Sequence, residues 1–421
     1  MSREHRLRPW HWSRREFLSR GLYGIGVGAG LPVALHRTST SLAAQAVQGT
    51  SLEKHPERIL VVVELSGGND GLNTVVPYGD AAYYRARPRI GIPEKSVIKA
   101  ADGFGFHPAT VGFERLYKEG ALAVVHGCGY DRPSLSHFSS MGFWHTGAPH
   151  AGEPLGWLGR LADARYSAST RNIIVDIDSA QSLAVRSGKH SPLVFDDPNS
   201  LRRDGSDGEK QALIALSQPR QTKNPMLDFL ASTAENAAES SDFVRQASAS
   251  YRTPVDYGMA GGLSGNLQRV AALIAAGMPT RLYYVTYRGN SFDTHVLQGD
   301  THSRLLMYSA DAVHGFIKDL ERTGYADQVA VVIFTEFGRR VEENGSLGTD
   351  HGTATPMFVV GKRVKGGFYG PPVSLTDLDD GNLKMTTDFR RVYASAIQEW
   401  LGCDQATAIL KGRFEPLGLF A

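Results

Sequence analysis

The chain has 421 residues, with 45 Lys and Arg, 43 Asp and Glu, and a hydrophobic share of 42%. This length can bury a full core as one large domain or two smaller ones. Residues 1–46 hold seven arginines and two glutamates, so the remainder carries 38 basic (45 − 7) and 41 acidic residues (43 − 2), a net charge of −3. Without a basic surplus, the composition excludes a general nucleic-acid-binding function.

Residues 1–46 predict a twin-arginine signal peptide. The pair Arg14-Arg15 is followed at the required spacing by Phe17-Leu18, then by a glycine-rich apolar stretch at 21–35 and a small-x-small cleavage site at 44–46. A membrane anchor is the alternative, but the stretch is too short and too rich in glycine to span about 30 Å of hydrocarbon.

We therefore expect cleavage before Val47 and a mature chain in the periplasm or secreted, with the twin-arginine export machinery as a partner. Because that pathway carries folded proteins, a metal or cofactor loaded before export would fit it. No later segment predicts a transmembrane helix. The two cysteines, Cys128 and Cys403, form neither a CxxC nor a zinc pattern. We expect two separate thiols, with a disulfide as the alternative.

Beyond a polar linker at 48–57, the pattern predicts an α/β fold. Continuous apolar runs are typical of strands that are covered on both faces. They lie at 59–63, 121–125, 173–175, 282–285, 329–334 and 357–360. Helical periodicity lies between them, at 108–119, 263–276 and 389–401 and in an apolar stripe over 305–320. This alternation predicts a mostly parallel sheet with helices on both faces.

The segment 187–262 differs from the rest. It is polar, rich in Ala, Ser and Gln, and lacks convincing strands. We predict a helical insertion outside the sheet, belonging to the single domain of residues 47–421.

Polar loops follow the predicted strands. In open α/β sheets, ligands bind beyond the carboxyl ends of the strands. The loops at 64–71, 126–138, 288–295 and 335–339 follow strands, and 348–352 precedes one. All of them interleave glycine with carboxylates, imidazoles or hydroxyls, which predicts one shared site.

Six residues of these loops are candidate metal ligands: Asp70, Asp293, His295, Glu336, Asp350 and His351. Carboxylates with neutral imidazoles suit zinc or manganese. Each residue alone also has a structural interpretation, since Asp70 could form a turn and Glu336 could pair with Arg339. Arg288 and Arg339 could neutralise the acids instead of a metal. The shared sheet edge favours the metal site.

These loops resemble the DUF1501 family of exported bacterial proteins. The resemblance covers nearly all of the mature chain. It rests on the motifs 65–74, 136–138, 292–295, 335–339 and 348–352. It implies an alkaline phosphatase-like fold, within the superfamily that includes the sulfatases, and by analogy a metal-dependent hydrolase of phosphate or sulfate esters.

The resemblance also implies roles for residues. Asp70 resembles the metal acid after the first strand, Asp293 and His295 resemble the next acid–histidine pair, and His351 resembles the late histidine. Glu336 falls where many members carry an Asp-His pair, and Phe337 replaces that histidine, which puts a complete two-metal site in doubt.

The nucleophile is less clear. Asp131 stands where sulfatases form formylglycine, so Ser136 beside His137 is the best candidate for the catalytic residues. Two functions remain open: a hydrolase, or a non-catalytic binding or structural protein on a degenerate hydrolase fold that acts with another exported protein.

Overall fold

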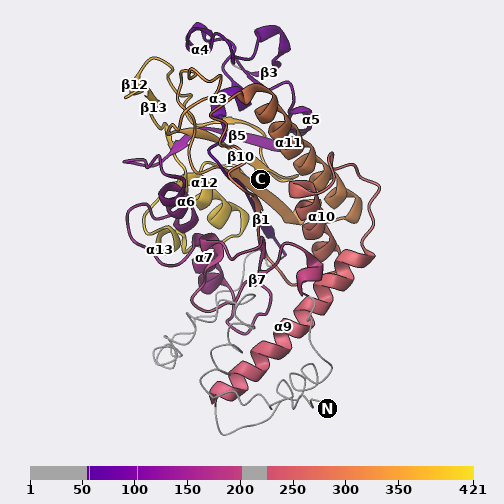
Figure 1. Cartoon of the computed structure of the whole chain (residues 1–421). Helices are drawn as coiled ribbons and strands as arrows, with labels where there is room; N and C mark the ends of the chain where they lie inside the picture. The colour runs from indigo at the N-terminus through magenta and orange to yellow at the C-terminus, as the bar shows by residue number, and fades with distance from the viewer. Residues whose placement is uncertain (1–54, 56, 102, 202–224) are drawn as a thin grey trace, which may run out of the picture. The chain divides into compact units, whose positions relative to one another are not determined.

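The computed structural model describes residues 55, 57–101, 103–201 and 225–421 (Figure 1). The predicted signal peptide and its cleavage site lie outside these residues. Within the described part of the chain, no helix is both long and apolar enough to cross a membrane.

A nine-stranded sheet organises the fold. Its strands run in the order β11-β5-β10-β9-β1-β8-β6-β7, and β14 pairs with β5 as well. The bounds are β1 (Ile59–Leu65), β5 (Leu122–Gly129), β6 (Ile174–Ile177), β7 (Leu193–Val194), β8 (Leu282–Tyr287), β9 (Val329–Phe334), β10 (Thr355–Val360), β11 (Gly367–Tyr369) and β14 (Thr387–Asp388). Only β10 runs against the others, antiparallel to both β5 and β9. The predicted mostly parallel sheet is confirmed.

Helices cover both faces of the sheet, as Figure 1 shows. In β1, Val61 and Val63 point into one core and Leu60 and Val62 into the other, so the run 59–63 is apolar throughout. The first core takes side chains from α5 (Val111–Lys118), α9 (Pro225–Ser250), α10 (Gly262–Ala275) and α11 (Gln298–Thr323). The second takes them from α6 (His137–Thr146), α7 (Trp157–Arg165), α12 (Arg390–Ala394), the π-helical turn Ser395–Trp400 and α13 (Ala406–Leu410).

Smaller elements lie beyond the sheet. They are α3 (Gly71–Thr74), β2 (Val75–Val76), α4 (Ala81–Ala86), β3 (Ile98–Ala101), β4 (Phe104–Phe106) and the pair β12 (Leu378–Asp379) and β13 (Asn382–Leu383). Leu72, Tyr83 and Leu383 share a third buried cluster that joins them. Short 3-10 turns occur at Glu94–Ser96, Leu183–Val185, Pro198–Leu201 and Ala326–Gln328.

The direction of β10 decides where the late loop lies. The carboxyl ends of β1, β8 and β9 share one edge of the sheet, because these strands are parallel. The antiparallel β10 begins at that same edge. The loop 348–352, which precedes β10, therefore joins the loops that follow the parallel strands.

The segment 187–262 is not wholly outside the sheet. It contains the predicted helix, α9, but also β7, which pairs in parallel with β6 through Val175 and Leu193. The prediction fails here because a two-residue edge strand leaves no readable periodicity. Residues 202–224 of the segment lie outside the described ranges. Cys128 and Cys403 are buried free thiols, as expected.

Three buried histidines should make the protein sensitive to acid. Burial lowers the pKa of His107 and of His126 to about 4 and that of His302 to about 3. Their unfolded pKa is about 6.5. Between these values the unfolded chain binds more protons, so the free energy of unfolding falls as pH drops below 6.5, by up to about 1.4 kcal/mol per pH unit and histidine.

Urea unfolding between pH 7.5 and 4.5 measures this slope. His126 stacks on Phe368 with ring centroids 5.1 Å apart, so the substitution His126→Phe keeps an aromatic contact. In that variant, the slope of the free energy of unfolding against pH should correspond to about one fewer bound proton. An unchanged slope would show that His126 does not contribute.

Candidate metal centre

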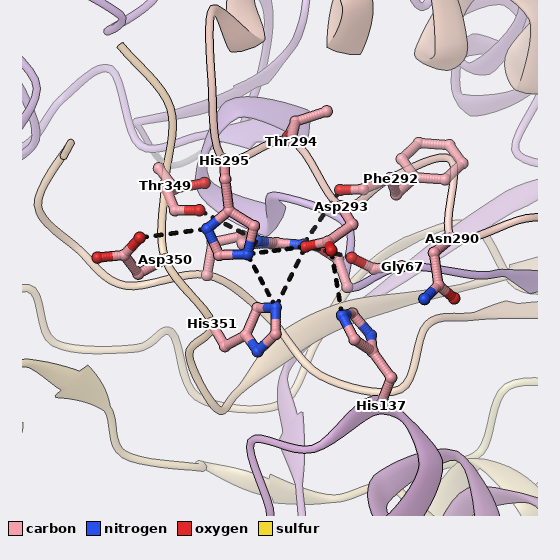
Figure 2. Close-up of polar contacts among 12 residues, drawn as sticks. Gly67, His137, Asn290, Phe292, Asp293, Thr294, His295, Thr349, Asp350 and His351 are labelled. Carbon is pink, nitrogen blue, oxygen red and sulfur yellow. Dashed lines mark hydrogen bonds and ion pairs between the residues drawn. The ribbon is translucent and has the colours of Figure 1, made fainter. Parts of the chain in front are cut away.

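Three loops bring histidines and a carboxylate together beyond the strand ends (Figure 2). His137 is the first residue of α6, after β5. Asp293 and His295 lie between β8 and α11, and His351 lies just before β10. An isolated β-bridge pairs His351 with Arg339 and fixes the late loop against the loop after β9.

The three imidazoles face Asp293 through their Nε2 atoms. Asp293 Oδ1 is 2.9 Å from His295 Nε2 and 3.1 Å from His351 Nε2. Asp293 Oδ2 is 3.4 Å from His137 Nε2, and the Nε2 atoms of His295 and His351 are 3.0 Å apart. One ligand atom from each of His137, Asp293 and His351 lies within 4.8 Å of the others.

The other ring nitrogen, Nδ1, of each histidine lies against an oxygen that accepts hydrogen bonds. The pairs are His137 with Glu336 Oε1 at 2.7 Å, His295 with Asp350 Oδ1 at 3.2 Å, and His351 with the Leu135 carbonyl at 2.8 Å. Because carbonyls and carboxylates only accept, Nδ1 carries the proton in each neutral ring. All three Nε2 lone pairs then point at the same place, as in metal-binding histidines held by outer partners.

One nitrogen of the group has no hydrogen bond. His137 Nε2 is buried and unbonded within the described part of the chain. Three lone pairs that face a carboxylate repel it unless a proton or a cation lies among them. Arg339 supplies a positive charge near Asp293 Oδ1 and His295 Nε2, at 2.7 Å and 3.4 Å. None of its contacts is with His137 Nε2. The hydrogen bond with Glu336 raises the pKa of His137, whereas burial lowers the pKa of His351. Imidazole nitrogens and a carboxylate oxygen match the ligand set of zinc, so these residues fit a divalent metal ion.

Glu336 and Asp350 stand one step behind the cluster. The Glu336 carboxylate is buried and accepts hydrogen bonds from the Gly67 amide at 2.9 Å and from Thr335 Oγ1 at 3.0 Å. Glu336 contacts Nδ1 of His137, the ring nitrogen that faces away from the cluster. In the same way, Asp350 contacts Nδ1 of His295. Both residues were expected as candidate ligands, but in this structure each one contacts a histidine of the cluster through Nδ1.

Asp70 does not join the cluster, contrary to the expectation. Its Oδ2 is 2.6 Å from Arg87 Nη1 and 2.5 Å from Gln298 Nε2, and its Oδ1 accepts from the Asn73 amide at the start of α3. Burial acts to raise the pKa of Asp70, but the charges of Arg87 and His302 and the hydrogen bonds from Arg87 and Gln298 together outweigh burial and lower that pKa. The carboxylate is thus neutralised inside the protein.

Of the two arginines that could replace a metal, only Arg339 reaches the centre. Arg288 Nε pairs with Asp178 at 2.8 Å. Arg339 is buried, and its Nη2 lies 2.7 Å from Asp293 Oδ1 while its Nε donates to the Gly68 carbonyl. Burial acts to raise the pKa of Asp293, but the hydrogen bond and charge of Arg339 lower it to about 2. Arg339 therefore holds one oxygen of Asp293 and leaves Oδ2 toward His137.

Ser136 and His137 do not form a nucleophile–base pair. Ser136 is exposed and its side chain does not cap α6, whereas His137 Nδ1 is taken by Glu336. Phe337 packs its ring 4.8 Å from the rings of both His137 and His351. Among the described residues, His137, Asp293 and His351 are the one group whose ligand atoms lie close enough together to hold a metal ion.

A family model matches more than half of the chain. The family model described as "Protein of unknown function (DUF1501)" matches residues 118–411. The chain belongs to the DUF1501 family. The search of curated proteins returned no match.

Solved structures resemble this DUF1501 protein at a distance. The zinc complex of the C-terminal periplasmic domain of EcEptC from Escherichia coli is 12% identical, over 72% of this chain and 73% of that chain, with a TM-score of 0.35. The PsFucS1 sulfatase from Pseudoalteromonas sp. is 12% identical, over 92% and 76%, with a TM-score of 0.35. A protein in the alkaline phosphatase superfamily from Vibrio parahaemolyticus is 11% identical, over 80% and 69%, with a TM-score of 0.34.

Gln298 clamps the two main ligand loops of the DUF1501 protein together. Its Oε1 accepts from Thr294 Oγ1 at 3.2 Å and from Thr349 Oγ1 at 2.7 Å, and its Nε2 donates to Asp70. Asp70 therefore supports the centre through Gln298. The sequence carries no signal for this role, since a glutamine at the start of a helix is unremarkable by pattern.

Glycines let these loops approach closely. A Cβ on Gly348 would lie 2.2 Å from the carbonyl carbon and oxygen of His295. A Cβ on Gly67, whose φ is +119°, would lie 2.6 Å from the Asp293 amide nitrogen. Any larger residue at these positions would separate the ligands.

Proposed function

We propose that this DUF1501 protein is an exported, metal-dependent hydrolase of phosphate or sulfate esters, active in the periplasm or outside the cell. His137, Asp293 and His351 would hold a zinc or manganese ion, with His295 beside them. The main observation that supports this proposal is that the Nε2 atoms of His137, His295 and His351 all face Asp293. The Nδ1 atom of each ring contacts a hydrogen-bond acceptor on the opposite side. The twin-arginine pattern at Arg14-Arg15 supports export.

The partial exposure of the centre favours catalysis over a structural metal. The side chains of His137, Asp293 and His351 are 22%, 28% and 23% exposed, so an ester can reach them. Structural zinc sites are closed, whereas catalytic sites keep an open position. A divalent ion bound here would act as a Lewis acid on the ester oxygen. Arg339 would keep Asp293 ionised, and Glu336 would keep the His137 ring oriented.

Metal analysis of the exported protein, combined with hydrolysis of 4-nitrophenyl phosphate and 4-nitrophenyl sulfate, tests the proposal. We expect bound zinc or manganese and measurable turnover in the wild type. His351→Ala should lower metal affinity and activity by at least about 100-fold, since losing an outer partner of a ligand already costs roughly 10–100-fold.

His150→Ala is the matched control. His150 lies on a loop near α6, but its Nε2 contacts the carbonyl oxygens of Asp131 and Arg132. This variant should retain metal and activity. Full activity in metal-free wild-type protein, or equal metal content in both variants, would contradict the proposal.

A non-catalytic role is the second candidate, and the bond from Arg339 to Asp293 favours it. With that carboxylate already neutralised, the cluster could persist without metal as part of a surface for another exported protein. Exported wild-type protein that carries no metal, and that hydrolyses neither ester after zinc or manganese is supplied, would support this role.

A further inference from the structure

Exposed apolar side chains gather around the candidate metal centre. Among the described residues, eight large hydrophobic side chains are exposed, and the three most exposed are Phe138 at 92%, Leu297 at 65% and Val296 at 62%. Phe138 directly follows His137, and Val296 and Leu297 directly follow His295. These three and Leu135, two residues before His137 and 39% exposed, form the apolar rim.

Single exposed apolar residues are ordinary on protein surfaces. A group of them beside a functional centre instead indicates a binding surface. Here four of the eight exposed side chains, including the three most exposed, lie within two residues of candidate ligands, on two segments of the chain. Chance scatter does not explain that concentration.

The backbone holds the rim in place at a conformational cost. Leu297 has a φ of +47°, in the left-handed region that is unfavourable for a non-glycine residue. Its amide donates to the Ser346 carbonyl at 2.9 Å, and the next amide, of Gln298, donates to the Leu347 carbonyl at 2.8 Å. Strain of this kind clusters at binding sites. The exposed Leu297 is therefore presented by an ordered loop.

The two halves of the rim flank the centre. On one side, the Leu135 carbonyl contacts His351 Nδ1 at 2.8 Å. On the other side, His351 Nε2 lies 3.0 Å from Nε2 of His295, the residue that precedes Val296 and Leu297 in the chain. A ligand whose anionic head lies at Asp293 would place the rest of its body over apolar side chains. The four rim side chains offer no hydrogen bonds to a sugar or a peptide.

We propose that the substrate is an amphiphilic ester, in which the phosphate or sulfate group is attached to an alkyl, acyl or aryl group that contacts the apolar rim. This inference rests on the proposed function, since the centre must bind the anionic head. It adds the chemical class of the rest of the substrate.

Calorimetry can test the inference by measuring how tightly two phosphonates bind the metal-loaded protein. Neither phosphonate can be hydrolysed, so the measurement does not depend on catalytic activity. Octylphosphonate, below its micellar concentration, should bind at least about tenfold tighter than methylphosphonate, the effect of burying roughly two methylene groups. Phe138→Ser should remove most of that difference, and it should fold normally because Phe138 is almost fully exposed. Met259→Ser, which changes a 50% exposed side chain outside the rim, should retain it.

The outcomes separate the two proposals. Equal binding of both phosphonates to the wild type would overturn the amphiphilic substrate and leave the hydrolase standing. Binding of neither phosphonate would overturn the proposed function and the inference with it. Self-association of the wild type in sedimentation, lost in Phe138→Ser and without a chain-length preference, would make the rim a protein interface and overturn the substrate class.

Discussion

Replacing Arg87 with methionine should lower the free energy of unfolding by about 3–5 kcal/mol, because it leaves the Asp70 carboxylate buried without its counter-charge. Both side chains are buried, and Arg87 Nη1 lies 2.6 Å from Asp70 Oδ2. The guanidinium also donates to the carbonyls of Arg340 and Val341, each at 2.9 Å, so the variant leaves further acceptors without partners. Urea unfolding at pH 7 measures the change.

Arg89→Met is the matched control, two residues away. Arg89 pairs with Glu343 at 2.5 Å but is 51% exposed, so its loss should cost less than about 1 kcal/mol. Adding Asp70→Asn to Arg87→Met should recover part of the stability, because it removes the uncompensated charge. Equal losses in the two single variants would show that burial of the Asp70 pair is energetically unimportant.

Replacing Gly348 with alanine should disrupt the centre, because the added methyl group would clash with the backbone of the loop that carries His295. The added Cβ would lie 2.2 Å from the carbonyl carbon of His295 and 2.6 Å from the Thr294 carbonyl oxygen, both backbone atoms. Overpacking of this kind costs about 1–3 kcal/mol. Because relief requires the loop of His295 to move away from that of His351, metal affinity should fall by roughly the 10–100-fold typical of disturbed ligand orientation.

Gly345→Ala tests the same loop without the clash. A Cβ on Gly345 would have no neighbour within 4 Å, and its backbone is not in the left-handed region. Unfolding and metal-binding isotherms of this variant should match the wild type. If Gly348→Ala also binds metal as the wild type does, close approach of the two loops is not needed for the centre.

The sequence predicted six of the nine strands of the main sheet, because strands covered on both faces leave uninterrupted apolar runs. It missed β7, β11 and β14, which are only two or three residues long. Asp293, His295 and His351 do converge, since residues after neighbouring parallel strands share one sheet edge. Even so, the convergence of His351 depends on β10 being antiparallel, which its apolar run does not encode. The direction of a buried strand is set by its neighbours.

The parts of the centre that could not be predicted depend on partners distant in the sequence. Asp70 has the nearest such partner: its glycine-rich turn was predicted, but Arg87, which neutralises it, follows helix α4 and lies 17 residues further along the chain. His137 was expected beside Ser136 as a catalytic pair, yet Glu336 orients it toward Asp293. The carbonyl that orients His351 belongs to Leu135, and a backbone acceptor leaves no trace in residue type.

The central place of β1 has a consequence for how the chain is made. This strand is the first of the main sheet to leave the ribosome, yet it pairs with β8 and β9, which begin only at Leu282 and Val329. At about 5–20 residues per second, the apolar run 59–63 waits for its partners on the order of ten seconds or more. Such a run, unpaired, is prone to aggregation. The nascent chain therefore needs shielding until most of it has been synthesised.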